Sequence, residues 1–417
     1  MSTSRPRVVL GVSGGIAAYK ACELLRRFTE SGHDVTVVPT ESALKFVGAA
    51  TWEALSGHPV ASGIFSRVDT VQHVRLGQSA DLLVIAPATA DLMARAVHGR
   101  ADDLLAATLL TARCPVVIAP AMHTEMWEHP ATLANVDTLR ERGVLVIDPA
   151  YGRLTGSDTG PGRLPEPNEI FEIAVDVLRR GQDSLGQDLR GRTVVISAGG
   201  TREFLDPVRY LGNRSSGKQG YALARAAVAR GADVTLIAAN VDLPDPAGAK
   251  VVPVVSTRDL HEAVLAAAAD ADVVVMAAAP ADFRPASRVG HKIKKQADGA
   301  VPDLVLVENP DILADLVSRR EAGTAPVLVG FAAETGDSVG SALDHARAKL
   351  SRKGCDLLVF NDVSGGAVFG QEHNQAVILG ADGTERSVPH GSKIALAHVV
   401  WDLVAQWLAD TGPHRAA

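Results

Sequence analysis

Residues 181–200, GQDSLGQDLRGRTVVISAGG, decide how this chain is organised. The stretch begins as a polar, glycine-bearing run and ends as a β-branched strand pattern that closes on glycines. Residues 5–15, RPRVVLGVSGG, show the same closing pattern ahead of a helical stretch. A strand pattern that ends in glycines therefore occurs twice in the chain, which indicates two α/β domains in tandem. We expect one domain at residues 1–180, a linker at 181–190 and a second domain at 191–417.

The composition excludes several classes of protein. With 417 residues and 47% hydrophobic content, each half can bury a core of its own. A formal charge of −7 gives no general attraction to nucleic acid or to an anionic membrane, so neither partner is expected. The cysteines Cys22, Cys114 and Cys355 lack metal-ligand spacing and fit a reducing compartment, which predicts a cytoplasmic protein. Apolar runs end well before the roughly 18 residues of a membrane-spanning helix.

Apolar runs that alternate with helical stretches are typical of a parallel sheet covered by helices on both faces. The first half is expected to form strands at residues 8–12, 34–38, 81–86, 115–119 and 144–147. The second half is expected to form them at residues 193–200 (TVVISAGG), 233–237, 251–255, 272–276, 304–307, 326–331 and 357–360. Residues 374–388 predict an antiparallel hairpin around Asp382-Gly383. The predicted fold class is α/β, with two tandem doubly wound, Rossmann-like or flavodoxin-like domains whose sheets are mainly parallel.

In such sheets a ligand binds at the carboxyl ends of the strands. In the first half these ends are polar or glycine-rich, at residues 13–15, 39–40, 87–91 and 120–123. The turn at Ser13 to Ile16 would point backbone N–H groups at an anion, and the hydroxyl of Thr40 would add a donor. The same turn is also a common packing device, so this segment alone leaves phosphate binding and packing equally open.

Taken in order, the motifs GVSGGIAAYK, VQHV, APATADLMARAVHGRADDLLA and PAMHTEMW resemble the flavin-dependent cysteine decarboxylase family over most of residues 7–168. The resemblance implies that the cofactor is FMN. It assigns FMN contacts to Ser13, Gly14, Gly15, Thr40, Ala88, Thr89, Ala90 and Asp91. His73, in VQHV, matches the family's catalytic histidine. Without the surrounding motifs, a lone histidine would be interpreted as a structural or surface residue.

The chemistry explains why such a site needs a flavin and a base. Loss of CO₂ beside an ordinary thiol-bearing carbon leaves a carbanion with nowhere to delocalise. Oxidation of that carbon to a thioaldehyde by flavin provides an electron sink, and the reduced flavin later returns the electrons. His73 is expected to take or relay the thiol proton.

Two positions depart from the family pattern. His123 stands in PAMHTEMW where asparagine is usual, and an imidazole can still donate to a substrate carboxylate, with a pH dependence that an amide lacks. Gly156 stands in the substrate-covering flap where several members carry a cysteine that protonates the enethiol. Either Ser157, Asp158 or a water molecule then supplies that proton, or the reductive half of the reaction is slower.

The motifs GGTREFLDPVRYLGNRSSGKQG, MAAAPADFRPA, HKIKK, ENPDIL and GFAAET resemble the phosphopantothenate-cysteine ligase family over residues 190–408. Joined to the first half, the resemblance is to bifunctional bacterial enzymes of coenzyme A biosynthesis. It implies that CTP activates 4′-phosphopantothenate as an acyl-cytidylate, that L-cysteine attacks it, and that the product is decarboxylated to 4′-phosphopantetheine. It also implies a homo-oligomer, with trimeric contacts through the decarboxylase half and dimeric contacts through the ligase half.

The charges of a triphosphate must be neutralised by cations and helix N-termini. Lys292, Lys294 and Lys295 could do this, and Lys349 and Lys353 share a helix face at i, i+4, although lysine runs are most often solvated faces. By resemblance, the CTP site comprises Met276, Ala277, Ala278, Asp282, Lys292, Asn309, Pro310, Asp311, Ile312, Phe331, Lys349 and Lys353.

Two further residues receive roles in the ligase half. Mg²⁺ would bridge the phosphates, with Asp282 as its candidate protein contact. Asn213 matches a residue that the family uses to turn over the acyl-cytidylate, and the alternative is turn chemistry ahead of Ser215.

Two other classes remain open. A nicotinamide-dependent oxidoreductase on two Rossmann-like domains is disfavoured because no GxGxxG is followed by an acidic ribose ligand. A flavin-binding regulatory subunit is disfavoured by the intact constellation of lysines and Asn213.

Overall fold

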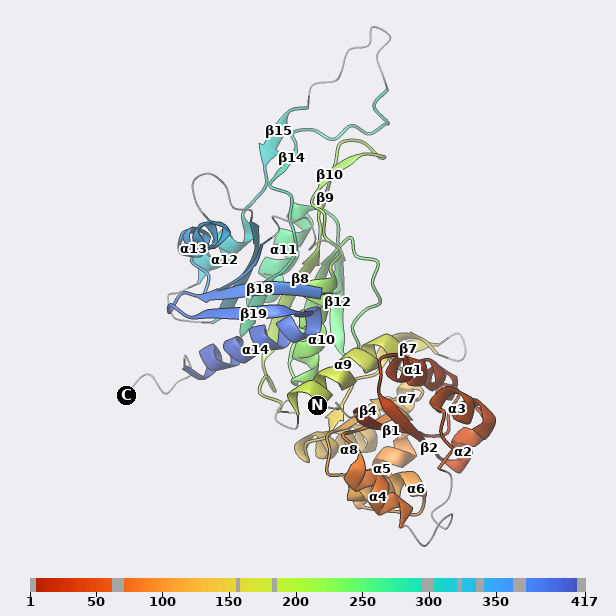
Figure 1. Cartoon of the computed structure of the whole chain (residues 1–417). Coiled ribbons are helices and arrows are strands. Elements are labelled where there is room, and N and C mark those ends of the chain that lie inside the picture. The colour runs from red at the N-terminus through yellow and green to blue at the C-terminus, as the bar shows by residue number, and fades with distance from the viewer. Residues whose placement is uncertain are drawn as a thin grey trace. The chain divides into compact units, whose positions relative to one another are not determined.

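The computed structural model describes residues 5–61, 71–154, 158–181, 186–294, 304–320, 325–334, 341–362 and 373–410. The chain forms two compact units, Met1–Gln187 and Asp188–Ala417 (Figure 1). Gly156, Ser157 and Lys295, which carry sequence predictions, lie outside the described residues.

The first unit is built on a five-stranded sheet in the order β2-β1-β3-β4-β5, with every neighbouring pair parallel. The strands are β1 (Arg7–Val12), β2 (Asp34–Pro39), β3 (Leu82–Ala88), β4 (Val116–Pro120) and β5 (Leu145–Val146). This is the flavodoxin-like order, in which the order of strand addition reverses between β1 and β3 and a crevice forms there. All five strands predicted for this half are confirmed.

Helices and one ribbon complete the first unit. The helices are α1 (Ala18–Glu30), α2 (Glu41–Leu44), α3 (Ala49–Ser56), α4 (Gln72–Ser79), α5 (Ala90–His98), α6 (Leu104–Thr111), α7 (Thr124–Trp127), α8 (Pro130–Glu141) and α9 (Pro167–Arg180). An antiparallel ribbon of β6 (Ala150–Arg153) and β7 (Thr159–Arg163) lies against the loop after β4, because the N–H of Met122 donates to the carbonyl of Gly162 at 2.9 Å.

The second unit has an eight-stranded sheet in the order β12-β11-β8-β13-β16-β17-β18-β19. Its parallel strands are β8 (Thr193–Gly199), β11 (Asp233–Ala239), β12 (Ala249–Val254), β13 (Val273–Met276), β16 (Val327–Glu334) and β17 (Leu357–Asp362). Numbered along the chain, these six follow the Rossmann order 3-2-1-4-5-6. β18 (His373–Gly380) and β19 (Glu385–Ser392) form the predicted antiparallel hairpin, which is confirmed.

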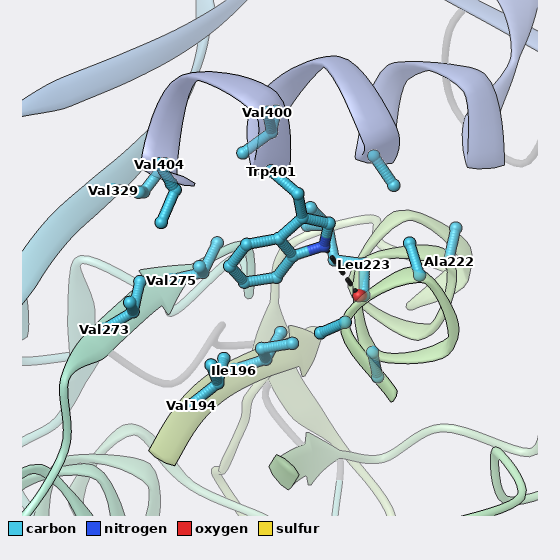
Figure 2. Close-up of a cluster of buried hydrophobic side chains, with 14 of the residues drawn as sticks. Val194, Ile196, Ala222, Leu223, Val273, Val275, Val329, Val400, Trp401 and Val404 are labelled. Atoms are coloured by element: carbon cyan, nitrogen blue, oxygen red, sulfur yellow. Dashed lines mark hydrogen bonds between the residues drawn. The ribbon is translucent and has the colours of Figure 1, made fainter. Parts of the chain in front are cut away.

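The helices of the second unit are α10 (Lys218–Ala229), α11 (Thr257–Ala268), α12 (Ile312–Arg319), α13 (Ala342–Lys353) and α14 (Lys393–Asp410). α10 packs against both β8 and α14. Figure 2 shows the core that results: Trp401 of α14 is fully buried among valines of the sheet, and its indole N–H donates to the carbonyl of Leu223 at 3.0 Å.

The sheet position predicted for one strand was wrong. Residues 304–307 were expected in the parallel sheet, but β15 (Leu306–Glu308) pairs only with β14 (Phe283–Pro285), in a separate antiparallel ribbon. Leu304 and Val305 are more than half exposed. An apolar run indicates that a segment tends to be covered, and it does not identify what covers it. A second ribbon, β9 (Arg202–Phe204) with β10 (Tyr210–Gly212), lies beside the first (Figure 1).

Candidate functional site

The turn after β1 is held by the hydroxyl group of Ser13. Ser13 Oγ donates to the carbonyl of Pro87 at 2.9 Å and accepts from the N–H of Thr89 at 2.9 Å. The residue is only 1% exposed. Its hydroxyl therefore joins the loop after β1 to the loop after β3, at the point where the strand order reverses.

The two glycines of this turn differ in how closely other atoms surround them. A Cβ at Gly14 would lie 2.3 Å from Cβ of Ser42, whereas a Cβ at Gly15 would meet no atom within 4 Å. Gly14 is therefore required by close packing with α2. Gly15 leaves open space ahead of α1, at the positive end of that helix.

A cavity of about 480 Å³ opens beside this turn. It is lined by the glycine turn, the start of α1, the loops after β3 and β4, and the β6–β7 ribbon. Of the residues predicted to contact FMN or substrate, the following line it: Gly14, Gly15, Thr89, Ala90 and His123.

The other predicted FMN contacts, Ser13, Thr40, Ala88 and Asp91, are not among the residues that line this cavity. Thr40 caps α2 by accepting the N–H of Ala43 at 3.2 Å. Ala88 is fully buried at the end of β3, and the carboxylate of Asp91 is 3.0 Å from Nε of Arg95. Together with Ser13, these residues support the loops, and their contact with FMN stays a prediction.

His73 lies on α4 and does not line the cavity. Its carbonyl accepts the hydroxyl of Thr111 at 2.8 Å. Its Nδ1 is buried without a hydrogen-bond partner among the described residues. Because a buried imidazole nitrogen is normally paired, this atom is the one unusual feature of the residue.

His123 lines the cavity at the N-terminus of α7, and its Nδ1 lies 3.5 Å from Oδ2 of Asp158. Asp158 stands one residue before β7. The pair links the loop after β4 to the ribbon. An imidazole N–H at this position can donate a hydrogen bond to an anionic ligand.

The cavity also contains cations that sequence reasoning missed. Lys20, Arg153 and Arg163 line it. Lys20 follows the glycine turn by five residues, and Arg153 and Arg163 are the last residues of β6 and β7. The only signal in the sequence was their proximity to the predicted turn and flap.

The second unit has a cavity of about 630 Å³ at the carboxyl ends of its central strands. Here a buried hydroxyl network fixes the loops: Thr201 Oγ1 accepts the N–H of Ala281 at 2.8 Å and lies 2.9 Å from Oγ1 of Thr257. Asn213 lies at its mouth, and its Nδ2 donates to the carbonyl of Pro280 at 2.8 Å.

Most residues predicted for the CTP site line this one cavity. They are Met276, Ala277, Ala278, Asp282, Asn309, Pro310, Asp311, Ile312, Phe331, Lys349 and Lys353, together with Asn213. They come from β13 and the loop after it, from the start of α12 and the loop before it, from β16, from α13 and, for Asn213, from the loop after β10.

Lys292 does not line this cavity. Its neighbour Ile293 donates its N–H to Asp206 at 3.2 Å and accepts from Arg209 at 3.1 Å. Both partners belong to the turn between β9 and β10. The Lys292 segment is thus attached to that ribbon, and its contact with CTP stays a prediction.

Asp311 and Lys353 form an ion pair at the edge of the cavity. Asp311 also caps α12 by accepting the N–H of Ala314 at 3.2 Å. Burial acts to raise the pKa of Asp311, but the bonds from Lys353 and from Ala314 outweigh it and hold that pKa below its usual value. The carboxylate is therefore charged at neutral pH and holds one of the two predicted lysines in place.

The lining includes further polar residues that sequence reasoning missed: Lys218, Gln219, Asn361, Asn374 and Lys393. Asn374 Nδ2 donates to Asn361 Oδ1 at 3.1 Å, while Oδ1 of Asn374 has no partner among the described residues. Asn361 lies at the carboxyl end of β17, so strand order could have identified it.

The described parts of both units contain no group of three or more His, Cys, Asp or Glu side chains that could hold a metal ion. No helix described has both the length and the apolar character that a bilayer crossing requires.

Two doubly wound units, each with a cavity at the carboxyl ends of its parallel strands, define a two-domain α/β protein of the nucleotide-binding type. Residues 1–179 match the family model described as Flavoprotein, and residues 189–408 match that of the DNA/pantothenate metabolism flavoprotein C-terminal domain.

Named relatives cover nearly the whole chain. The coenzyme A biosynthesis bifunctional protein CoaBC of Mycolicibacterium smegmatis is 60% identical over 410 residues, 97% of this chain and 99% of that protein. The protein of the same name from Bacillus subtilis is 42% identical over 97% of this chain and 98% of that one. A solved structure of the C-terminal domain of a CoaBC protein is 32% identical and covers 54% of this chain and 100% of that chain, with a TM-score of 0.45. The chain belongs to the family of coenzyme A biosynthesis bifunctional proteins, which confirms the resemblance predicted from its motifs.

Proposed function

We propose that the second unit joins 4′-phosphopantothenate to L-cysteine with CTP, and that the first unit decarboxylates the product to 4′-phosphopantetheine with FMN. The proposal is supported mainly by the two cavities. The cavity of the second unit is lined by residues of the ligase motifs, and that of the first unit by residues of the decarboxylase motifs. We also propose a cytoplasmic location, because the chain has no disulfide framework among Cys22, Cys114 and Cys355.

The residues of the first cavity fit FMN. Gly15 leaves open space at the positive end of α1, where a phosphate group could approach the backbone. Apolar residues such as Ile16 and Met122 line the same cavity and suit an aromatic ring. When bound, the flavin supplies a two-electron acceptor that makes CO₂ loss possible.

The protein's own groups would then orient the substrate and move protons. His123, with Asp158 beside Nδ1, would donate to the substrate carboxylate and hold it in the cavity. His73 would take the thiol proton at its ring nitrogen. Since His73 does not line the cavity of its own unit, we propose that a trimer brings it to the cavity of a neighbouring copy.

In the ligase cavity, Lys349 and Lys353 would neutralise the triphosphate of CTP, and Asn213 would orient the acyl-cytidylate. Asp282 lines the cavity, and its carboxylate makes no ion pair with any described residue. One such carboxylate suffices for Mg²⁺, which binds mainly through phosphate oxygens and water. Lys292, on the segment attached to the β9–β10 ribbon, would reach the nucleotide.

The two ribbons offer a surface for dimerisation of the ligase half. Their exposed apolar side chains include Val208, Tyr210, Phe283, Leu304, Val305 and Leu306. Exposed apolar side chains that cluster on the two neighbouring ribbons favour a protein interface there. Val305→Asp should shift the mass measured by light scattering towards smaller species, and an unchanged mass would exclude this ribbon from the contact.

The test is a coupled assay on the full-length protein, supplied with 4′-phosphopantothenate, L-cysteine and either CTP or ATP, following pyrophosphate and CO₂. The expected protein is yellow, releases FMN on denaturation and forms both products with CTP. Lys292→Ala should stop pyrophosphate release while flavin stays bound, and His73→Asn should stop CO₂ release while ligation continues. Colourless protein that also fails to bind CTP in calorimetry would refute the proposal.

A further inference from the structure

The loop after β13 lines the cavity of the second unit, and Asn309 holds it at two points. Nδ2 of Asn309 donates to the carbonyl of Ala281 at 2.8 Å, and the backbone N–H of Asn309 donates to the carbonyl of Asp282 at 2.8 Å. Ala281 is buried, and its own N–H donates to Oγ1 of Thr201 at 2.8 Å. The position of Asp282 in the cavity therefore depends on Asn309.

Arg284 of β14 orients the side chain of Asn309. Nη1 of Arg284 donates to Oδ1 of Asn309 at 3.0 Å and to the carbonyl of Glu308, the last residue of β15. A guanidinium group can only donate and a carbonyl group can only accept. The amide of Asn309 must therefore turn its oxygen towards Arg284 and its NH₂ group towards Ala281. If the amide flipped, two donors would meet at Arg284 and two acceptors at Ala281.

Arg284 acts from behind the wall of the cavity. Its two acceptor residues, Glu308 and Asn309, line the cavity, whereas Arg284 is not among the described lining residues. In the ribbon Arg284 stands opposite Val307, so both acceptors follow directly on the neighbouring strand. Pairing of the two strands uses backbone groups and needs no guanidinium. The motif MAAAPADFRPA includes Arg284, and the sequence gave it no role.

We propose that Arg284 is a positioning residue of the ligase reaction, which acts through the amide of Asn309 to hold Ala281 and Asp282 in the conformation that receives CTP. The proposal rests on the proposed ligase function of the second unit. A hydrogen bond from a charged donor is stronger than a neutral one, so its loss releases the amide. A small displacement of a residue that lines a site is enough to weaken ligand binding there.

The experiment uses the full-length protein and the variant Arg284→Met, which keeps an unbranched side chain and removes its donors. KM for CTP should rise about tenfold, while kcat and the KM for L-cysteine stay within about twofold of the wild type. Calorimetry with CTP alone should show the same loss of affinity. Arg284→Lys keeps a charged donor and should raise KM for CTP by less than about threefold. If the KM values for CTP and L-cysteine rose together, the damage would be general and the proposal would be wrong.

Arg288→Met is the matched control, because it removes the same charge four residues later in the chain. Cζ of Arg288 lies 5.1 Å from the centroid of the Phe204 ring, so this guanidinium packs on an aromatic side chain. The variant should bind CTP like the wild type. An equal loss of affinity in Arg288→Met and Arg284→Met would show a general effect of charge and overturn the proposal.

A double-mutant cycle tests whether Arg284 acts through Asn309. In an Asn309→Ala background, Arg284→Met should change KM for CTP by less than about threefold, because residues that act in one chain of contacts are not additive. A full tenfold effect in both backgrounds would show that Arg284 acts independently of Asn309, which contradicts the proposal.

The β14–β15 ribbon is also part of the proposed dimer contact, so the mass of each variant is measured by light scattering. Arg284→Met should keep the wild-type mass. A smaller mass together with weaker CTP binding would assign Arg284 to the subunit contact and overturn the positioning role. Wild-type protein that releases no pyrophosphate with CTP would refute the proposed ligase function itself. Normal release by the wild type, with an unchanged KM for CTP in Arg284→Met, would refute only the role of Arg284.

Discussion

The side-chain Nδ2 of Asn213 donates a hydrogen bond to the carbonyl oxygen of Pro280 at 2.8 Å. The two residues lie 67 positions apart, on the loops that follow β10 and β13. Pro280 lies two residues before Asp282, the candidate contact for Mg²⁺. The bond therefore couples the loop proposed to orient the acyl-cytidylate to the loop proposed to receive the metal.

Asn213→Asp should lower the kcat/KM of ligation by about 10- to 100-fold. The change is nearly isosteric, but it replaces the donor with a carboxylate oxygen that faces the carbonyl of Pro280, a mismatch of about 1–3 kcal/mol. CTP-dependent pyrophosphate release measures the effect. Decarboxylation in the same preparation serves as the control, because it takes place in the other unit. Equal loss of both activities would show general damage and contradict the prediction.

The Gly14 and Gly15 pair separates packing from ligand binding. Gly14→Ala should lower the free energy of unfolding of the first unit by about 1–3 kcal/mol, because its Cβ would overlap Ser42. Gly15→Ala should leave the stability of the apoprotein unchanged, because its Cβ meets nothing within 4 Å. The same methyl group should nevertheless lower FMN content, since it projects beside the cavity. Urea unfolding and the absorbance of bound flavin measure the two effects.

Wild-type FMN affinity in Gly15→Ala would show that the flavin does not approach this turn. An unchanged unfolding free energy in Gly14→Ala would show that α2 moves aside at little cost.

The three thiols should be nearly inert in the native protein. Burial raises the pKa of Cys114 and of Cys355 to about 11, and burial also raises the pKa of Cys22. At pH 8 only roughly one in a thousand of the Cys114 and Cys355 thiols is then ionised, and the thiolate is the reactive form. Reaction with a chromogenic disulfide should be slow at pH 8, accelerate as pH rises towards 11, and become fast for all three thiols in urea.

Rapid reaction of the native thiols at pH 8 would contradict this prediction. Cys355→Ala, at a buried position, should leave the remaining native rate almost unchanged and remove one reactive thiol in urea.

The central strands were predictable because parallel strands buried on both faces are continuous apolar runs, as in β3, LLVIAPA. The run at residues 304–307 has the same composition, but it belongs to an exposed ribbon. Its position depends on pairing with β14, about 20 residues earlier, and local sequence does not encode such a pairing.

Residues that line the cavities were predictable where they follow the carboxyl end of a strand, as do Gly14, Gly15 and Ala277. They were not predictable where a side chain reaches the cavity from a helix or a ribbon. Lys20 resembles a solvated lysine on an amphipathic helix, and only the tertiary structure brings it to Glu166, 146 positions away. Lys292 shows the converse, because a strong motif match lies outside the lining of the cavity.

Each unit should unfold cooperatively and independently of the other, and one fully buried tryptophan in each unit can test this. Trp401 in the second unit and Trp52 in the first are both fully buried, and each donates its indole N–H to a carbonyl, that of Leu223 at 3.0 Å and that of Val47 at 3.1 Å. Trp401→Phe should lower the free energy of unfolding of the second unit by about 1–3 kcal/mol through the lost bond and the unfilled volume, and Trp401→Ala by about 3–5 kcal/mol. Trp52→Phe is the matched control and should shift only the transition of the first unit, reported by flavin release. If either substitution moved both transitions equally in urea, the two cores would not be energetically independent.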